Sequence, residues 1–256
     1  MTGRLAPEGV TGMINSKWLG VMVLAAGATV GSFAQNMVGP PTNLTPDLKY
    51  IENWGKISWD GTRISLTSNK GKVDGTGLDK DLYIANVDGS DRFKASPRPK
   101  NAEECGFLSP DGSKVVLHAF TAAGGGENGA TEIYIVDLAT GVSTQMTYNA
   151  AYDAYPAWSP DGTKIAFMSQ RNVSTTQTYQ VYVMDADRPE DTVANPTGNV
   201  PKQVTNPDGV STSAKAQCAR VIWSPDSSKI LYTQEIGQRL KFREVGGFRR
   251  DGGARP

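Results

Sequence analysis

The sequence predicts an all-β fold, a β-propeller built from four-stranded blades. A Ser-Pro-Asp-Gly turn starts at Ser109, recurs at Ser159 and Ser224, and has a variant at Ser58, so successive starts lie 51, 50 and 65 residues apart. A tyrosine-centred strand follows the turn at a nearly constant distance in the first three units. The chain has 28 glycines and 15 prolines and lacks long helical periodicity, which favours short strands and tight turns. A repeat of about 50 residues with four strands is typical of a propeller blade.

Each turn motif has a physical reason to join two strands. Proline presets φ at the first central position, aspartate bonds to nearby backbone N–H groups, and glycine tolerates positive φ at the exit. Apolar residues flank the turn on both sides, as at 157–158 and 165–168, which is typical of a hairpin. We assign a structural role to the repeated turn residues Asp60, Gly61, Pro110, Asp111, Gly112, Pro160, Asp161, Gly162, Pro225 and Asp226.

The other strands of each unit follow the turn at steady offsets. Third strands, each with a tyrosine, are expected at 81–86, 132–137 and 180–185. Short polar-apolar segments that close the units lie at 92–94, 143–147 and 202–205. The third unit is longer because of a polar stretch, 187–200, that we interpret as an inserted loop. The expected blades are 49–97, 98–148, 149–206 and 207–238.

Residues 1–34 are predicted to be a signal peptide. A lysine precedes an apolar stretch, 18–30, that is too short to span a bilayer comfortably. Small residues then stand where a signal peptidase reads, so cleavage is expected between Ala34 and Gln35, with Met13 as a possible true start. No other stretch is apolar enough to span a membrane. The mature chain is therefore expected to be periplasmic or secreted.

Charge separates the repeats from the C-terminal stretch. The formal net charge is zero, which argues against a nucleic-acid-binding role. After a short N-terminal segment, 35–48, the repeats extend over 49–236. Residues 35–238 carry 18 basic and 23 acidic residues, whereas 239–256 carry six basic and two acidic residues. We expect 239–256 to be a basic tail that is disordered or truncated.

Residues 155–185 resemble a WD-repeat-like unit of the TolB propeller family. The matching segments are Tyr-Pro-Ala-Trp-Ser-Pro-Asp-Gly at 155–162, Lys-Ile-Ala-Phe at 164–167 and Val-Tyr-Val-Met-Asp at 181–185. The resemblance implies an exported propeller with a protein or peptide partner in the cell envelope. Similar units also occur in prolyl-oligopeptidase-like enzymes and in some polysaccharide lyases, so the resemblance is more specific for fold than for function.

The chain departs from the TolB pattern in two respects. No separate α/β domain precedes the units, and four units are recognisable where the resemblance implies six. Because an open stack of blades exposes faces and strand edges, we favour a partial version of a six-bladed propeller. A four-bladed ring, with 48–51 as a closing strand, is the alternative.

The sequence contains no catalytic constellation. Its single histidine, His118, lies in an expected strand, and the Gly-x-Ser-x-Gly elbow of a hydrolase domain is absent. The acidic loop from Asp74 to Asp81 could bind calcium, but it does not match an EF-hand and we favour a solvated loop. Cys105 and Cys218 are interpreted as small buried residues in preference to a bridge. We therefore expect no enzyme, no metal site and no cofactor.

Loops on the face opposite the repeated turns are the expected binding surface, because loops on a rigid scaffold often carry function. Aromatic side chains among them are favoured anchors for a partner. The candidate binding residues are Tyr148, Tyr152, Asp153, Tyr155, Arg171 and Asn172. The resulting hypothesis is a periplasmic scaffold that binds a protein or peptide. The alternatives are the propeller portion of a larger exported enzyme and a small-ligand-binding propeller.

Overall fold

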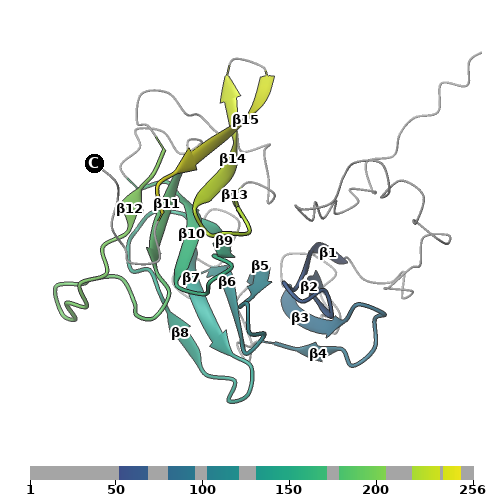
Figure 1. Ribbon diagram of the computed structural model, residues 1–256. Coiled ribbons are helices and arrows are strands. Elements are labelled where there is room, and N and C mark those ends of the chain that lie inside the picture. Colours follow the sequence, from purple (N-terminus) through teal and green to yellow (C-terminus); the bar gives the residue numbers. More distant parts are fainter. Residues whose placement is uncertain are drawn as a thin grey trace, which may run out of the picture. The chain divides into compact units, whose positions relative to one another are not determined.

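A computed structural model describes seven stretches of the chain (Figure 1), namely 52–68, 80–95, 103–120, 131–171, 179–205, 221–236 and 239–248. The chain divides into two units, Met1–Gly39 and Pro40–Pro256, and all described residues belong to the second. This described part contains strands and no helix, so the predicted all-β class is confirmed. The expected signal peptide and the segment 35–48 lie outside the described residues.

The strands form four antiparallel sheets, the blades, in which hydrogen-bonded order follows chain order. Blade 1 contains β1 (Glu52–Ile57), β2 (Arg63–Ser68), β3 (Asp81–Asn86) and β4 (Phe93–Lys94). Blade 2 contains β5 (Glu103–Leu108), β6 (Lys114–Phe120), β7 (Thr131–Asp137) and β8 (Ser143–Gln145). Blade 3 contains β9 (Asp153–Trp158), β10 (Lys164–Ser169), β11 (Gln180–Asp185) and β12 (Lys202–Gln203). Blade 4 contains β13 (Val221–Trp223), β14 (Lys229–Ile236) and β15 (Arg239–Gly246).

Strand β15 corrects the expected end of the repeats. We expected a disordered or truncated tail from residue 239, but β15 pairs with β14 in unbroken antiparallel register over eight residues. Its apolar residues Leu240 and Phe242 alternate with basic ones. This period of two indicates a strand, but the high local charge led us to expect a tail. The last part of the expected tail, 249–256, lies outside the described residues.

One aspartate oxygen organises each repeated turn. In blade 2, the Ser109 hydroxyl donates to Asp111 Oδ1 (2.6 Å), and the same oxygen accepts the backbone N–H of Ser113 (3.0 Å). The serine contact is the main reason why the pKa of Asp111 falls to about 2. Equivalent pairs of contacts are made by Asp60, Asp161 and Asp226. Each of these carboxylates therefore holds the serine hydroxyl and a backbone N–H of its own turn.

The second strands pack against a neighbour on each face. Successive side chains of a strand point to opposite sides of the sheet. In β6, Val115 and Leu117 pack with Leu82 and Ile84 of blade 1, whereas Val116 packs into the core shared with blade 3. In β10 the same alternation divides the side chains between the cores shared with blades 2 and 4. Apolar cores therefore join each described blade to the next.

The first strands of blades 1, 2 and 3 are each irregular at the same place. Their register with the second strand shifts between Asn53 and Lys56, between Glu104 and Phe107, and between Ala154 and Ala157. Within two of these bulges, Cys105 and Tyr155 have positive φ of 54° and 56°. Bulges redirect side chains and are common beside functional sites.

Cys105 corrects a second expectation. Its side chain is buried, as expected, but it is disulfide-bonded and is not a free thiol. Whether two cysteines bond depends on which segments the fold brings together, and the distance between them along the chain does not determine it. Cys218, the other cysteine of the chain, lies outside the described residues.

Candidate functional site

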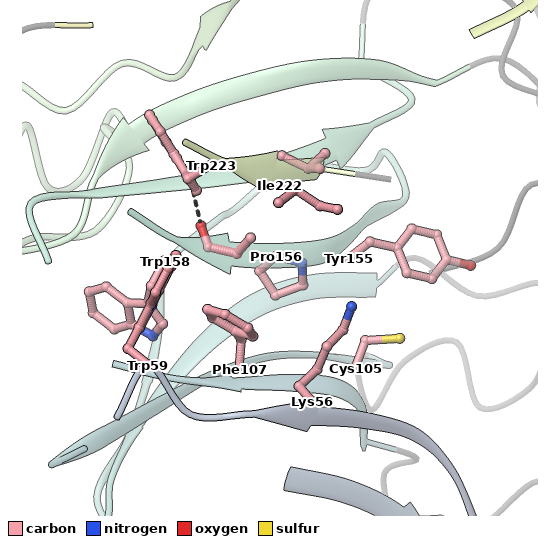
Figure 2. Close-up of a pocket in the computed structure, with 11 residues that line it drawn as sticks. Lys56, Trp59, Cys105, Phe107, Tyr155, Pro156, Trp158, Ile222 and Trp223 are labelled. Carbon is pink, nitrogen blue, oxygen red and sulfur yellow. Dashed lines mark hydrogen bonds between the residues drawn. The ribbon is translucent and has the colours of Figure 1, made fainter. Parts of the chain in front are cut away.

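The first strands of all four blades line one pocket, which we call the first-strand pocket. Its cavity volume is about 80 Å³. Figure 2 shows Ile222 and Trp223 of β13 on one side of it and Trp59, Phe107 and Lys56 on the other. The lining residues are Lys56, Trp59, Cys105, Phe107, Tyr155, Pro156, Ala157, Trp158, Val221, Ile222 and Trp223.

Five of the eleven lining residues of this pocket are aromatic. The rings of Trp59 and Phe107 meet edge to face with centroids 5.9 Å apart. Trp223 is fixed by a hydrogen bond from its Nε1 to the carbonyl oxygen of Ala157 (3.1 Å), which joins blade 4 to blade 3. At the solvent side, Trp59 is 39% exposed and Ile222 is 52% exposed. The pocket therefore combines fixed aromatic walls with apolar groups that a ligand can cover.

Trp158 lines the pocket and carries a buried hydrogen-bond donor. Its side chain is 3% exposed, and its Nε1 has no hydrogen-bond partner among the described residues. A buried indole N–H normally finds an acceptor, and leaving one unsatisfied costs roughly 1–3 kcal/mol.

The described lining of the pocket is mostly apolar. Lys56 is the one charged residue among the described lining residues, and it already has an interaction partner. Most of the remaining lining is aromatic or aliphatic. Such a site favours a ligand with an apolar body.

Sequence reasoning found little of this pocket, although a signal was present. Trp158 and Trp223 each directly precede the serine of a repeated turn, and Trp59 takes the proline position of the variant turn. A tryptophan therefore stands next to three of the four turns, where the first strands end. Of the five candidate binding residues that the structure describes, Tyr155 alone lines the pocket.

Asp153 and Arg171 lie instead in a buried network. Asp153 is fully buried and accepts hydrogen bonds from the Ser169 hydroxyl (2.5 Å) and from Arg171. The guanidinium of Arg171 also pairs with Glu190 (3.1 Å) of the loop after β11. It lies over the ring of Tyr182, with its carbon 5.2 Å from the ring centroid. Both side chains therefore stabilise blade 3.

Tyr152 packs in an aromatic cluster that joins blades 2 and 3. Its ring contacts those of Phe120 and Tyr179, with centroids 6.5 and 5.9 Å apart. Tyr148, another candidate, is half exposed and donates from its hydroxyl to the backbone oxygen of Gln145 (3.1 Å). Asn172 lies outside the described residues. The structure therefore brings these candidates to different places.

His118 belongs to the same aromatic cluster. It is buried in β6, and its Nδ1 accepts the backbone N–H of Tyr155 at 3.4 Å. Burial is the main cause that lowers the pKa of His118 to about 4, so the ring is neutral at physiological pH. Its ring also lies 5.2 Å from that of Tyr155, measured between centroids. This histidine contributes to the contact between blades 2 and 3.

The described residues contain no group of three or more His, Cys, Asp or Glu side chains that could hold a metal ion. Most of the loop considered for calcium, 74–79, lies outside the described part, and Asp81 at its end pairs with Lys94 of β4 at 2.9 Å. Within the described stretches, no helix is long and apolar enough to cross a membrane.

Similar proteins include both TolB proteins and enzymes. The putative TolB of Agrobacterium tumefaciens superposes with a TM-score of 0.55 at 18% identity, over 78% of this chain and 62% of that one. A puromycin hydrolase superposes with a TM-score of 0.53 at 17% identity, over 80% of this chain and 28% of that one. The uncharacterized peptidase YuxL of Bacillus subtilis (strain 168) is 28% identical over 130 residues, which are 51% of this chain and 17% of that protein. This chain thus spans a minor part of the enzymes it matches.

These relatives correct the expectation of no enzyme. We drew that expectation from the lack of a catalytic constellation. It is wrong, because proteins described as a peptidase and a hydrolase contain a propeller of this kind. The part of these proteins that matches this chain is a minor share of their length, so a matching part without catalytic motifs is no evidence against an enzyme.

The family itself follows from the repeats. The family model of the TolB beta propeller domain matches residues 55–243, well over half of the chain. The match begins in β1 and ends in β15, so it spans all four described blades. This chain belongs to the TolB beta-propeller domain family.

Proposed function

We propose that this chain is an exported propeller that binds a protein or peptide partner of the cell envelope through the first-strand pocket. The TolB family membership and the expected signal peptide support an exported binding role. The observation that carries the proposal is the pocket itself, where Trp59, Trp158 and Trp223 from three blades gather beside Lys56. Tryptophan is among the residues that contribute most strongly to protein interfaces.

The chemistry of the pocket favours a segment with one large apolar side chain. Burying such a side chain contributes roughly 1.5–3 kcal/mol, and contact between aromatic rings adds about 0.5–1.5 kcal/mol. A peptide segment can supply such a side chain.

Titration of the chain with a library of short peptides, followed by tryptophan fluorescence, tests this proposal. We expect binding to change the fluorescence, and the variant Trp59→Ala to weaken binding at least tenfold, since a central interface aromatic typically contributes about 2 kcal/mol or more. Phe93→Ala is the matched control, because Phe93 is an exposed aromatic of β4 that does not line the pocket. Equal affinities of both variants would contradict the proposal.

A second candidate function is the propeller portion of a larger exported peptidase. The resemblance to the peptidase YuxL over 130 residues supports it. It is tested with the product of the complete natural gene, incubated with a serine-hydrolase activity probe and chromogenic peptide substrates. Covalent labelling together with peptide cleavage would support the peptidase, and a product that neither labels nor cleaves would count against it.

A further inference from the structure

Strand β15 is the third strand of blade 4, and its outer edge has no neighbouring strand in the part of the chain that the structure describes. In blades 1, 2 and 3, a fourth strand of two or three residues, β4, β8 or β12, pairs with the third strand. The backbone N–H and C=O groups along a free strand edge can pair with another extended chain. The other three blades show that the architecture accommodates a strand at this place.

The register of the strands shows where a fourth strand would pair with β15. In blade 3, Tyr182 lies three residues before the partner of Lys164, the lysine of the turn motif. This tyrosine pairs with Gln203 of the fourth strand. In blade 4 the turn lysine is Lys229, and the residue three positions before its partner is Arg243. Arg243 therefore takes the place of the third-strand tyrosine.

This replacement changes the chemistry that a fourth strand must offer. In blade 2, the Tyr134 hydroxyl donates a hydrogen bond to Gln145 Oε1 of the fourth strand (3.2 Å). In blade 3, the Tyr182 hydroxyl donates to Gln203 Oε1 (2.9 Å). An arginine carries several donors and a fixed positive charge, and the acceptor that matches it best is a carboxylate. An aspartate or glutamate is therefore favoured opposite Arg243.

Two more basic residues of β15 alternate with Arg243 along the strand. Lys241 and Arg239 stand two and four positions before it, so all three share one place in the period of two. Their register partners in β14, none of which is acidic, are Tyr232, Gln234 and Ile236. Opposite charges on paired strands stabilise a sheet, and like charges destabilise it. The edge therefore favours an acidic strand over a second copy of this basic strand.

The outer half of the β14–β15 hairpin has two strands in the described stretches. Strand β13 pairs with 230–232 of β14, whereas β15 pairs with 229–236. A hairpin of two strands is marginally stable in water, and a sheet of three strands is more stable. A strand added along β15 would therefore stabilise the part of the hairpin that does not pair with β13.

We propose that the outer edge of β15 binds an extended acidic segment of a partner protein, which becomes the fourth strand of blade 4 with a carboxylate opposite Arg243. In this mode of recognition, main-chain hydrogen bonds supply affinity and alternate side chains supply specificity. The site is separate from the first-strand pocket, because none of the described lining residues of that pocket belongs to β15. The two sites can therefore be tested independently.

Two synthetic peptides added to the full chain test this inference, namely Thr-Glu-Val-Glu-Val-Glu-Thr and its counterpart with lysine in place of glutamate. Fluorescence anisotropy of the labelled peptides measures their affinities. We expect the glutamate peptide to bind about tenfold more tightly or better, because attraction at the paired positions becomes repulsion in the lysine peptide. Hydrogen exchange should show added protection at every second amide of β15, the amides that face outward, and no change at those paired with β14.

Arg243→Glu should weaken binding of the glutamate peptide about tenfold and strengthen binding of the lysine peptide. Lys202→Glu is the matched control, because Lys202 is an exposed basic residue of β12, the edge strand of blade 3, and this variant should keep the wild-type affinities.

Three results would overturn the inference. The first is equal affinity of the two peptides for the wild type, and the second is added protection that does not alternate along β15. The third is protection of both sets of β15 amides before any peptide is added, because the chain itself would then cover this edge. These comparisons use the wild type, so they decide the question even if Arg243→Glu does not fold.

Discussion

At Gly61, the preference of the repeated turns for glycine can be attributed to backbone conformation alone. Gly61 has a φ of 73°, and no atom lies within 4 Å of the place where a β carbon would stand. At Gly112, with φ of 70°, a β carbon would also lie 2.4 Å from Arg63 Nη2. The fourth turn has Ser227 at this position, with a φ of 60°. The fold thus tolerates a residue other than glycine at this turn position, although that residue must adopt a left-handed backbone conformation.

Gly61→Ala should therefore destabilise the chain by about 1 kcal/mol, through backbone conformation alone. Gly61→Asn should cost less, because asparagine adopts this conformation more readily. Urea unfolding curves measure both differences. An alanine variant as stable as the wild type would show that the turn does not depend on this glycine.

At the scale of the element, the bulge of β5 brings its backbone close to blade 1. A β carbon on Gly106 would lie 2.4 Å from Leu82 Cδ2, and Leu82 is fully buried. The backbone oxygen of Gly106 also accepts the Ser65 hydroxyl (2.6 Å). Gly55 occupies the equivalent place in β1, where the nearest atom to a β carbon would be the Ser65 oxygen at 3.9 Å. One bulge is closely packed and the other is not.

Gly106→Ala is therefore expected to destabilise the chain by about 1–3 kcal/mol, as overpacking of a filled core does. Gly55→Ala, the matched control, should change stability by much less. Adding Leu82→Ala to Gly106→Ala should recover part of the loss caused by the clash. Chemical denaturation of the four variants measures these effects, and similar losses for the two single glycine variants would contradict close packing at β5.

At the scale of the whole molecule, the features that repeat along the chain could be predicted from the sequence. The turns, the tyrosine strands and the TolB resemblance depend on residues within one unit of about 50 positions, so spacing predicts them. The end of the repeats was predicted less well. The many charged residues in 239–246 favoured the prediction of a tail. Leu240 and Phe242 nevertheless alternate with charged residues, as in a strand.

What the sequence could not predict depends on contacts between units. Arg171 and Asp153 look like surface residues in the sequence, and their burial follows from the inserted loop that brings Glu190 back to them. The pocket depends on which first strands meet and on bulges that redirect Tyr155. Neither the meeting of strands nor the bulges leave a periodic trace in a single sequence.

The central claim is that a partner binds at the first-strand pocket, and site-specific photo-crosslinking in intact cells tests it most directly. A photoreactive phenylalanine analogue replaces Ile222, an exposed lining residue, or Phe93, an exposed residue outside the pocket. The account predicts a discrete crosslinked protein from position 222, absent from position 93 and lost when Trp59→Ala is added. Equal crosslinking at both positions, or a product that persists in the Trp59→Ala background, would contradict it.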